Sequence, residues 1–215
     1  MAKIVGVATT WNEAKSIGHL VLGFRLAGCQ DVIIVDNCST DGTAEIAEQR
    51  GATVIEKPCT ISEGLMTGWK HAVLAGADYV LQCDAGDSFD PLEGQSFVGL
   101  KADLVVGMRL IYVGRSWRRF ASLMFSQACN RLTGFAVADW TSGFRLFSRD
   151  LLISLLGKDF RYRGHVWQAE VLLRALYSGA IVKEQPVSYI AGRSNMPLRD
   201  WLEALGFLVR LGCRS

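Results

Sequence analysis

The feature that most constrains the fold is a repeated alternation of short apolar runs with amphipathic segments through the first hundred residues. Residues 3–10 are rich in β-branched side chains, and residues 12–28 then carry apolar side chains at helical spacing. The same order returns over 31–51, 52–77 and 78–100. Continuous apolar strands separated by helices are typical of a parallel sheet covered on both faces. The sequence therefore predicts an α/β fold.

After a further apolar run at 102–108, the pattern changes to helices, which we expect over 116–134, 165–180 and 197–212. The chain has 215 residues and is 50% hydrophobic, which suits one domain with a sizeable core. The last predicted helix has an apolar side that we expect to pack on the domain rather than on a membrane surface. This side consists of Trp201, Leu202, Leu205, Leu208, Val209 and Leu211.

The charge is distributed unevenly along the chain. Residues 1–100 contain 6 basic and 13 acidic residues, whereas residues 101–165 contain 11 basic and 4 acidic residues. The net charge of +2 hides this asymmetry. The basic middle segment predicts an anionic partner, such as a lipid phosphate, an anionic membrane or DNA.

Several classes of protein are disfavoured by what the sequence lacks. Its six cysteines have no CxxC or Cys/His spacing, so neither a disulfide framework nor a zinc site is indicated. The N-terminus has no signal-peptide pattern, and no apolar run approaches the ~18 residues that span a bilayer. We therefore expect a cytoplasmic protein, and peripheral contact with a membrane surface stays open.

Polar side chains follow three of the predicted strands. Since the carboxyl ends of parallel strands meet at one edge of a sheet, we expect a site there. The residues are Thr9, Asn12 and Glu13 after the first strand, Asp36 after the second, and Asp84 and Asp87 after the fourth.

The acidic cluster at the fourth strand indicates a bound cation. Asp84, Asp87 and Asp90 lie within seven residues and would repel one another without a positive charge among them. Mg²⁺ and Mn²⁺ prefer a few carboxylates together with phosphate oxygens. We expect a divalent ion that bridges Asp84, with Asp87 or Asp90, to a diphosphate.

Three functions could use such an edge: a nucleotide-sugar transferase, a nucleotidyltransferase, or a non-catalytic nucleotide-binding module. The chain has no GxxxxGK[ST] segment and no GxGxxG after a strand, so the phosphates would be held in another way.

A series of segments in order gives the chain a family resemblance over about residues 3–200. They are ATTWNEAKSI, IIVDNCSTDGT, QCDAGDSFDP, VVGMR, DWTSGFRLFSR and HVWQAEVLLRALYSGAIVKEQPVSYIAGRSNM. In these segments the chain resembles the family 2 glycosyltransferases, most of all dolichyl-phosphate mannose synthase and its polyprenyl-phosphate relatives.

The resemblance implies a single GT-A domain, with a nucleotide-sugar-binding half at 1–108 and an acceptor-binding half at 109–215 that ends in the amphipathic helix. It also implies a nucleoside-diphosphate sugar donor, for which GDP-mannose and UDP-glucose are both compatible, a divalent cation (Mg²⁺ or Mn²⁺), and inversion at the anomeric carbon.

By the same resemblance, Thr9, Asn12 and Glu13 match donor-binding positions, and Asp36 matches the carboxylate that contacts the nucleoside. Asp84 matches the first acid of the DxD motif. Gly86 stands where the family usually has the second acid, and Asp87 follows one residue later. If Gly86 abolishes metal binding, the alternative is a catalytically silent nucleotide-sugar binder.

The resemblance also assigns residues to the second half. Arg118, Arg119 and Ser122 fall where the lipid-phosphate synthases hold phosphates, and Arg145 and Arg193 occupy comparable anion-binding positions. Arginine suits this task because its planar fork pairs with two phosphate oxygens. Glu170 matches an acid that faces the site, and Asp139 lies in the DWTSGFR segment.

The acceptor decides the mechanism. A polyprenyl phosphate is already anionic and needs no general base. A hydroxyl acceptor on a glycan, a protein or a modified nucleic-acid base needs one, for which Asp87, Asp139 and Glu170 are the candidates. A nucleic-acid partner is the least supported, since no nucleic-acid-binding motif is visible.

Overall fold

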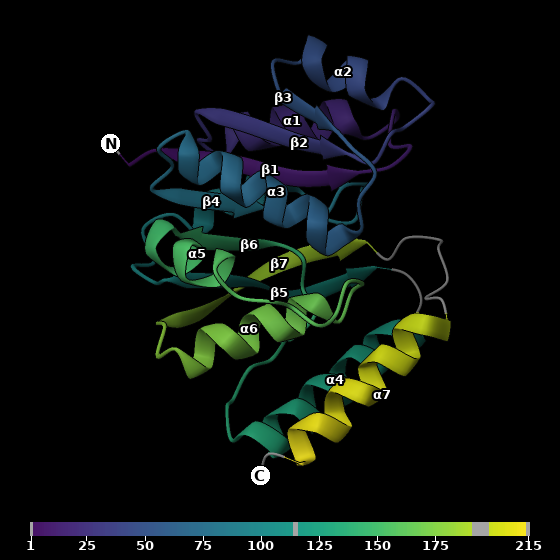
Figure 1. Ribbon diagram of the computed structural model, residues 1–215, viewed down its shortest axis with the longest axis vertical. Helices are drawn as coiled ribbons and strands as arrows, with labels where there is room; N and C mark the ends of the chain where they lie inside the picture. The colour runs from purple at the N-terminus through teal and green to yellow at the C-terminus, as the bar shows by residue number, and fades with distance from the viewer. Residues whose placement is uncertain (1, 114–115, 191–197, 214–215) are drawn as a thin grey trace.

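The computed structural model describes residues 2–113, 116–190 and 198–213, with residues 111, 112 and 116–118 described by their backbone alone (Figure 1). Within these residues, the strands form one sheet in the order β3-β2-β1-β4-β6-β5-β7. The strands are β1 (Ile4–Thr10), β2 (Asp31–Asp36), β3 (Thr53–Glu56), β4 (Tyr79–Gln82), β5 (Leu104–Val113), β6 (Arg145–Ser148) and β7 (Val182–Ile190).

The helices cover the sheet and extend beyond it. They are α1 (Ile17–Leu26), α2 (Thr43–Gln49), α3 (Ile61–Leu74), α4 (Ser116–Thr133), α5 (Arg149–Leu156), α6 (Trp167–Tyr177), α7 (Leu198–Gly212) and the 3₁₀ helix η1 (Pro91–Ser96). The α/β prediction is confirmed, and the first four strands and first three helices fall within their predicted ranges. Within residues 90–100, where the sequence predicts a helix, only the 3₁₀ helix η1 (Pro91–Ser96) forms.

The sheet is mostly parallel because β6 alone runs against its neighbours. β1 pairs in parallel with β2 and β4, and β5 pairs in parallel with β7, while β6 is antiparallel to both β4 and β5. The expectation that only helices follow residue 108 was wrong. β7 is an edge strand in which only Val187 is buried, and it has Pro186 in its middle, so it lacks the continuous apolar run of a central strand.

Each face of the sheet has its own core. Val5 and Val7 of β1 lie on the face that packs against α3, α5 and α6, with Trp69 and Trp167 fully buried there. On the opposite face of the sheet, Ile4 and other buried apolar residues pack against α1 and η1. This two-sided burial is the reason that the central strands read as uninterrupted apolar runs.

The last helix packs on α4, and the two helices run side by side away from the sheet (Figure 1). The rings of Phe125 and Phe207 are 6.0 Å apart. The expectation that the apolar side of α7 packs on the domain is only partly correct. Leu211 is buried, whereas several other residues of this side are exposed. The exposed members are Trp201 (40%), Leu202 (62%), Leu205 (60%) and Val209 (58%).

Close contact between α3 and β1 yields a prediction about stability. A Cβ added at Gly68 would lie 2.4 Å from Cγ1 of Val7, which is fully buried. We expect Gly68→Ala to lower the free energy of unfolding, because overpacking costs about 1–3 kcal/mol and the gain in helix propensity returns only about 1 kcal/mol. Urea denaturation measures this change.

Gly206 in α7 is the matched control, since a Cβ there meets nothing within 4 Å. Gly206→Ala should raise the free energy of unfolding by up to about 1 kcal/mol. Equal effects of the two substitutions would contradict the contact between α3 and β1.

Candidate functional site

The carboxyl ends of β1 and β2 are joined by Asp36. Its buried carboxylate accepts hydrogen bonds from Thr10 Oγ1 at 2.8 Å and from the backbone N and Oγ of Ser39, both at 2.6 Å. Three donors therefore already bind this carboxylate, and it fixes the loop after β2 against the end of β1.

The loop after β1 contains the other residues predicted to bind a donor. Asn12 has a positive φ of 54°, and its Oδ1 accepts a hydrogen bond from the backbone of Thr40 at 3.0 Å. Glu13 Oε2 accepts one from Ser16 Oγ at 2.7 Å. Thr9 points its methyl group at α3, because a Cβ on Gly64 would lie 2.2 Å from Thr9 Cγ2. Asn12 and Glu13 thus line the edge, whereas Thr9 packs beside it.

Asp84 follows β4 and lies at the same edge of the sheet. Its carboxylate packs against Gly143, where a Cβ would lie 2.0 Å from Asp84 Oδ2. Among the described residues, none donates a hydrogen bond to this carboxylate. Burial raises the pKa of Asp84, while the charges of His165, Arg109 and Arg145 oppose that rise. The carboxylate oxygens are therefore available to an external donor or cation.

The residues that follow Asp84 include a second carboxylate, that of Asp87. Gly86 has φ +95° and lies beside Glu13, and Asp87 is exposed along a cavity of about 280 Å³. No group of three His, Cys, Asp or Glu residues suited to a metal occurs in the described part of the chain. Mg²⁺ on a nucleotide, however, needs only one or two carboxylates besides phosphate oxygens and water, a donor set that Asp84 and Asp87 fit. Asp90 caps η1 instead, accepting from Leu92 N at 2.9 Å.

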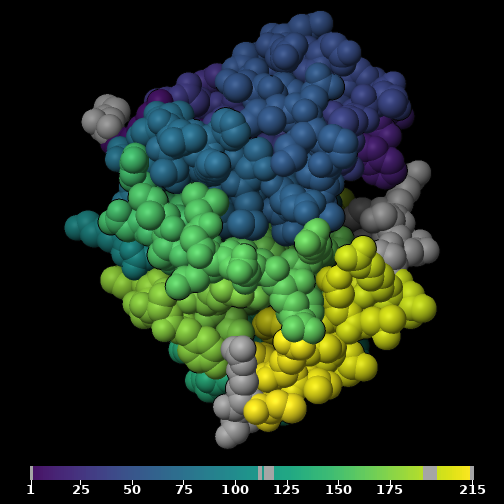
Figure 2. Space-filling view, viewed as in Figure 1, coloured from purple at the N-terminus to yellow at the C-terminus, as the bar shows by residue number. Residues whose placement is uncertain are grey.

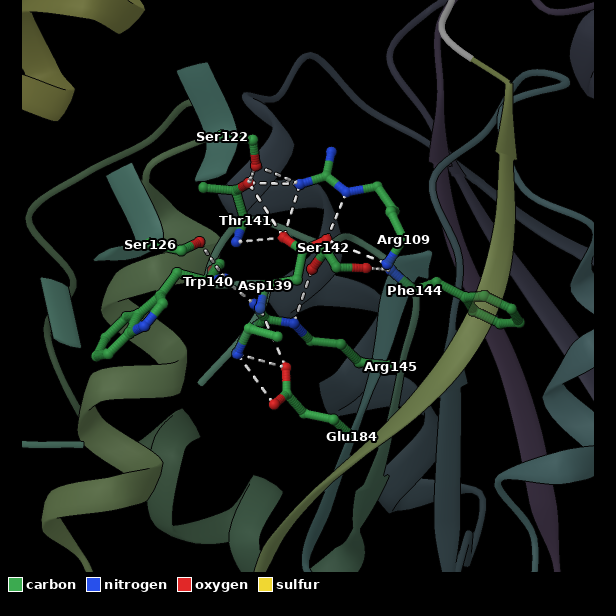
Figure 3. A network of polar contacts seen from close by, with 11 residues as sticks. Arg109, Ser122, Ser126, Asp139, Trp140, Thr141, Ser142, Phe144, Arg145 and Glu184 are labelled. Atoms are coloured by element: carbon green, nitrogen blue, oxygen red, sulfur yellow. Dashed lines mark hydrogen bonds and ion pairs between the residues drawn. The ribbon is translucent and has the colours of Figure 1, made fainter. Parts of the chain in front are cut away.

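A buried ion pair between Arg109 and Asp139 organises the second half of the site (Figure 3). Arg109 Nε and Nη2 donate to the two Asp139 oxygens at 2.6 and 2.7 Å. Nη2 also donates to Ser122 Oγ at 2.9 Å and to Thr141 Oγ1 at 2.6 Å, and the guanidinium lies 5.0 Å from the ring of Tyr189.

This pairing corrects the expectation that Asp139 acts as a base. Burial alone would raise the pKa of Asp139, but the charge and hydrogen bonds of Arg109, together with a backbone bond from Thr141, hold it below its usual value. Asp139 is therefore an ion-pair partner. Arg109 was missed among the candidate residues, although it ends the VVGMR segment and this position was the available signal.

The DWTSGFR segment is held from two further sides, by β7 and by α4. Glu184 of β7 accepts from the backbone N of Ala138 at 2.9 Å and of Asp139 at 3.0 Å. Trp140 Nε1 donates to Asn130 Oδ1 of α4 at 2.7 Å. These contacts fix the segment that carries Gly143 to Asp84.

Arg145 is a second correction. It is fully buried and donates to the carbonyl oxygens of Ser142 and Gln168, both at 2.8 Å, and of Trp140 at 3.1 Å (Figure 3). Burial lowers its pKa to about 10. A guanidinium enclosed by backbone carbonyls does not face an anion, so Arg145 stabilises the segment rather than presenting a phosphate site.

Glu170 is a third correction, since it does not face the site. Its Oε2 accepts from the backbone N of Arg161 at 3.0 Å and of Tyr162 at 3.1 Å, and its Oε1 is 2.8 Å from Arg174 Nη2. Glu170 therefore anchors the segment before α6.

The remaining predicted residues lie on or near α4. Ser122 is bonded to Arg109 and lies 3.1 Å from Thr141 Oγ1, and Arg119 is exposed. The side chain of Arg118 and the whole of Arg193 lie outside the described residues. Phosphate binding by these residues stays a prediction.

Comparison with known proteins gives concordant matches. The sequence model of the family "Glycosyl transferase family 2" matches residues 7–156. An undecaprenyl-phosphate mannosyltransferase of Micrococcus luteus is 27% identical over 208 residues, which cover 87% of this chain and 84% of the relative. A polyprenol monophosphomannose synthase of Mycolicibacterium smegmatis is 26% identical over 230 residues, covering 97% and 86%.

Solved structures show the same architecture. Glucosyl-3-phosphoglycerate synthase of Mycobacterium tuberculosis, in complex with phosphoglyceric acid, matches with a TM-score of 0.73 at 20% identity, over 98% of this chain and 80% of that one. A complex of that enzyme with Mn²⁺, UDP-glucose and phosphoglyceric acid matches at 0.71 and 19%, over 98% and 78%. The single-domain GT-A fold is thereby confirmed.

The buried ion pair predicts a strong effect of removing Asp139. Asp139→Asn removes the carboxylate charge that faces Arg109, and we expect it to lower the free energy of unfolding at pH 7 by about 3–5 kcal/mol. Because the folded pKa of Asp139 is lowered, its contribution is present above the unfolded value near 3.9 and is lost as pH falls through the folded pKa. The difference between variant and wild type should therefore shrink below about pH 4.

Chemical denaturation between pH 3 and 7 measures this dependence. The exposed pair of Lys3 and Asp31, 2.8 Å apart, is the control, and Asp31→Asn should cost less than about 1 kcal/mol. A comparable loss in both variants would refute the central role of the Arg109–Asp139 pair.

Proposed function

The chain belongs to glycosyltransferase family 2, and from this premise we propose that it is an inverting, metal-dependent enzyme that transfers a hexose from a nucleoside-diphosphate sugar to a polyprenyl phosphate. The observation that carries this proposal is Asp84, whose carboxylate lies at the carboxyl edge of the sheet and receives no hydrogen bond from the described residues. The names of the two curated relatives support the acceptor.

The donor would bind to the first half of the chain, at 1–108. Asn12 and Glu13 line the edge, and Asp36 holds the adjoining loop through its three hydrogen bonds. The nucleoside would meet this preformed surface and the Asp36 region. A structure of the mycobacterial enzyme in complex with UDP supports a nucleoside diphosphate as the donor's leaving group, and the choice between GDP-mannose and UDP-glucose is part of the test below.

Asp84 and Asp87 would hold a Mg²⁺ or Mn²⁺ ion, which supplies positive charge to the diphosphate leaving group. The raised pKa of Asp84 reflects the cost of an uncompensated carboxylate there, a cost that a cation relieves. Crystals of the mycobacterial relative that contain Mn²⁺ together with UDP support this choice of ion.

The acceptor would bind in the second half, at 109–215, and the surface of α4 and α7 supports an acceptor carried by a lipid. Apolar side chains exposed there are Phe120, Leu123 and Met124 of α4 and Leu198, Trp201, Leu202, Leu205 and Val209 of α7. Figure 2 shows α7 in yellow on the outside of the molecule. The exposed charged residues described on these helices are arginines, namely Arg119, Arg131, Arg199 and Arg210.

An apolar surface with basic residues suits peripheral contact with an anionic bilayer. Among the described residues, no helix has the length and apolar character needed to cross a membrane.

A hydroxyl acceptor is the second candidate. The observation in its favour is His165, whose side chain is 56% exposed and whose imidazole, when protonated, opposes the raised pKa of Asp84. Asp139 and Glu170 are paired elsewhere, so they do not supply the base that a hydroxyl requires.

Asp84→Asn tests the assignment of the metal and the donor. We expect donor turnover to fall by on the order of 100-fold or more, because the variant loses the charge that holds the cation. Release of nucleoside diphosphate from UDP-glucose and GDP-mannose, and thermal stabilisation by donor with and without Mn²⁺, measure the effect.

Glu48, an exposed acid on α2, provides the control variant Glu48→Gln, which should keep full turnover. A folded Asp84→Asn protein with most of its turnover would eliminate the proposed role of Asp84. Release of pyrophosphate in place of nucleoside diphosphate would instead identify a nucleotidyltransferase.

The surface of α4 and α7 can be tested independently of catalysis. The double variant Leu202→Glu and Leu205→Glu should lose most of its binding to phosphatidylglycerol vesicles, because it places two negative charges on the apolar side. Co-sedimentation measures binding, and donor hydrolysis should stay unchanged. Leu74→Glu, at a residue of α3 that is 74% exposed, is the matched control. Equal binding by all three proteins would argue against membrane contact through α7.

A further inference from the structure

The strand that leads to Asp84 ends in a buried amide, which has no role in the proposal so far. Gln82 is the last residue of β4 and is fully buried. It lies on the face of the sheet where Trp69 and Trp167 form part of an apolar core. An amide in such surroundings is costly to bury unless its polar atoms are hydrogen-bonded.

The orientation of this amide is determined by its partners. Trp69 Nε1 can only donate, so the atom of Gln82 that faces it at 3.2 Å is Oε1. The carbonyl oxygen of Gly143 can only accept, so the atom that faces it at 3.1 Å is Nε2. Nε2 also donates to Oε1 of Gln168, in the first turn of α6, at 3.4 Å. Both polar atoms of the amide are therefore bonded in one orientation.

Gln82 ties β4 to the DWTSGFR segment where backbone pairing between the two strands stops. β4 and β6 are antiparallel, and their pairing ends with Gln82 opposite Arg145. Extending that register by two residues places Asp84 opposite Gly143. The bond from the Gln82 side chain to the Gly143 carbonyl thus continues the connection towards Asp84 after the ladder has ended.

The carboxylate of Asp84 packs directly against Gly143. A Cβ on Gly143 would lie 2.0 Å from Oδ2 and 2.1 Å from Oδ1 of Asp84, so a hydrogen atom is all that fits beneath the carboxylate. The position of this carboxylate therefore depends on where the Gly143 peptide lies.

The carbonyl groups on either side of Gly143 are bound by other donors. Arg145 Nε donates to the oxygen of Ser142 at 2.8 Å (Figure 3), and the backbone N of Gly107 in β5 donates to that of Phe144, also at 2.8 Å. Neither donor belongs to β4. The link from β4, the strand that leads to the site, is supplied by Gln82.

We infer that Gln82 is a positioning residue, which holds the Gly143 peptide beneath Asp84 and thereby sets where this carboxylate meets the cation. The inference rests on the proposed function and deepens it, because it names the group in the core that orients a proposed metal ligand. An apolar side chain would fill the same space without the cost of burying an amide, so packing alone does not explain a glutamine here. A fully bonded buried amide instead favours one arrangement of the groups that it contacts.

Mn²⁺ binding tests the inference without any turnover. The whole chain is titrated with Mn²⁺ in the presence of UDP or GDP, and the free ion is followed by electron paramagnetic resonance. We expect Gln82→Met to raise the dissociation constant for Mn²⁺ by about 10-fold or more, the effect typical of residues that orient a metal ligand. Calorimetric binding of UDP or GDP without metal should not change.

Val80→Ala is the matched control for lost stability. Val80 is fully buried in the same apolar core, two residues before Gln82 and hence on the same face of β4. Its truncation should lower the urea concentration at the midpoint of unfolding and leave Mn²⁺ affinity at the wild-type value. An equal loss of Mn²⁺ affinity in Val80→Ala and Gln82→Met would overturn the inference, because general destabilisation would then account for both.

Gly143→Ala examines the contact with Asp84 itself, whether or not Gln82→Met folds. The φ of Gly143 lies outside the left-handed region, so the added Cβ acts through its overlap with the carboxylate. Mn²⁺ affinity should again fall by about 10-fold or more. Gly157→Ala, where a Cβ meets nothing within 4 Å, should bind Mn²⁺ as the wild type does.

The outcomes separate this inference from the proposed function. Wild-type Mn²⁺ affinity in folded Gln82→Met or Gly143→Ala protein, when Asp84→Asn has lost the ion, would overturn the inference alone. Absence of Mn²⁺ binding by the wild type with either nucleotide would overturn the proposed metal site and, with it, the positioning role of Gln82.

Discussion

The site depends above all on the buried ion pair between Arg109 and Asp139. Arg109 comes from β5, and the pair reaches Ser122 of α4 and the ring of Tyr189 of β7. Charges removed from water must be paired and hydrogen-bonded, so this contact leaves the segment around Asp139 little freedom to move. That segment brings Gly143 against Asp84, and a remote ion pair thereby determines the surroundings of the residue that carries the proposed chemistry.

The uneven charge of the sequence becomes an electrostatic division of the folded protein. The acidic first part ends its strands at the edge where Asp84 lies, and positive charges of the second part, from Arg109 and Arg145, act on that carboxylate. A diphosphate at an edge with carboxylates needs a cation between them. A basic, apolar surface on α4 and α7 faces outward on the same half, and suits an anionic acceptor at a bilayer.

Much of the first half of the fold could be predicted, and less of the second. The strands β1, β2 and β4 are buried on both faces, so their sequences are continuous apolar runs that predict strands. β7 lies at the edge of the sheet with every residue but Val187 exposed or half-exposed, and β6 has only four residues. Neither leaves a periodic signal that separates it from a loop, and their place in the sheet depends on pairing with distant strands.

The sequence by itself determined the α/β class, the family, and the edge of the sheet where the polar residues gather. It does so because apolar strands alternate with helices along the chain and polar residues follow the strands. Only the tertiary structure decided which charged residues face that edge. Arg145 and Glu170 are charged residues of the kind that bind substrates. Arg145 nevertheless donates to backbone carbonyls, and Glu170 accepts from backbone amides. Asp139 is paired with an arginine thirty positions away, and His165 with an aspartate of the last helix. An ionised side chain takes the partner that lies nearest in space, and a linear sequence does not contain that distance.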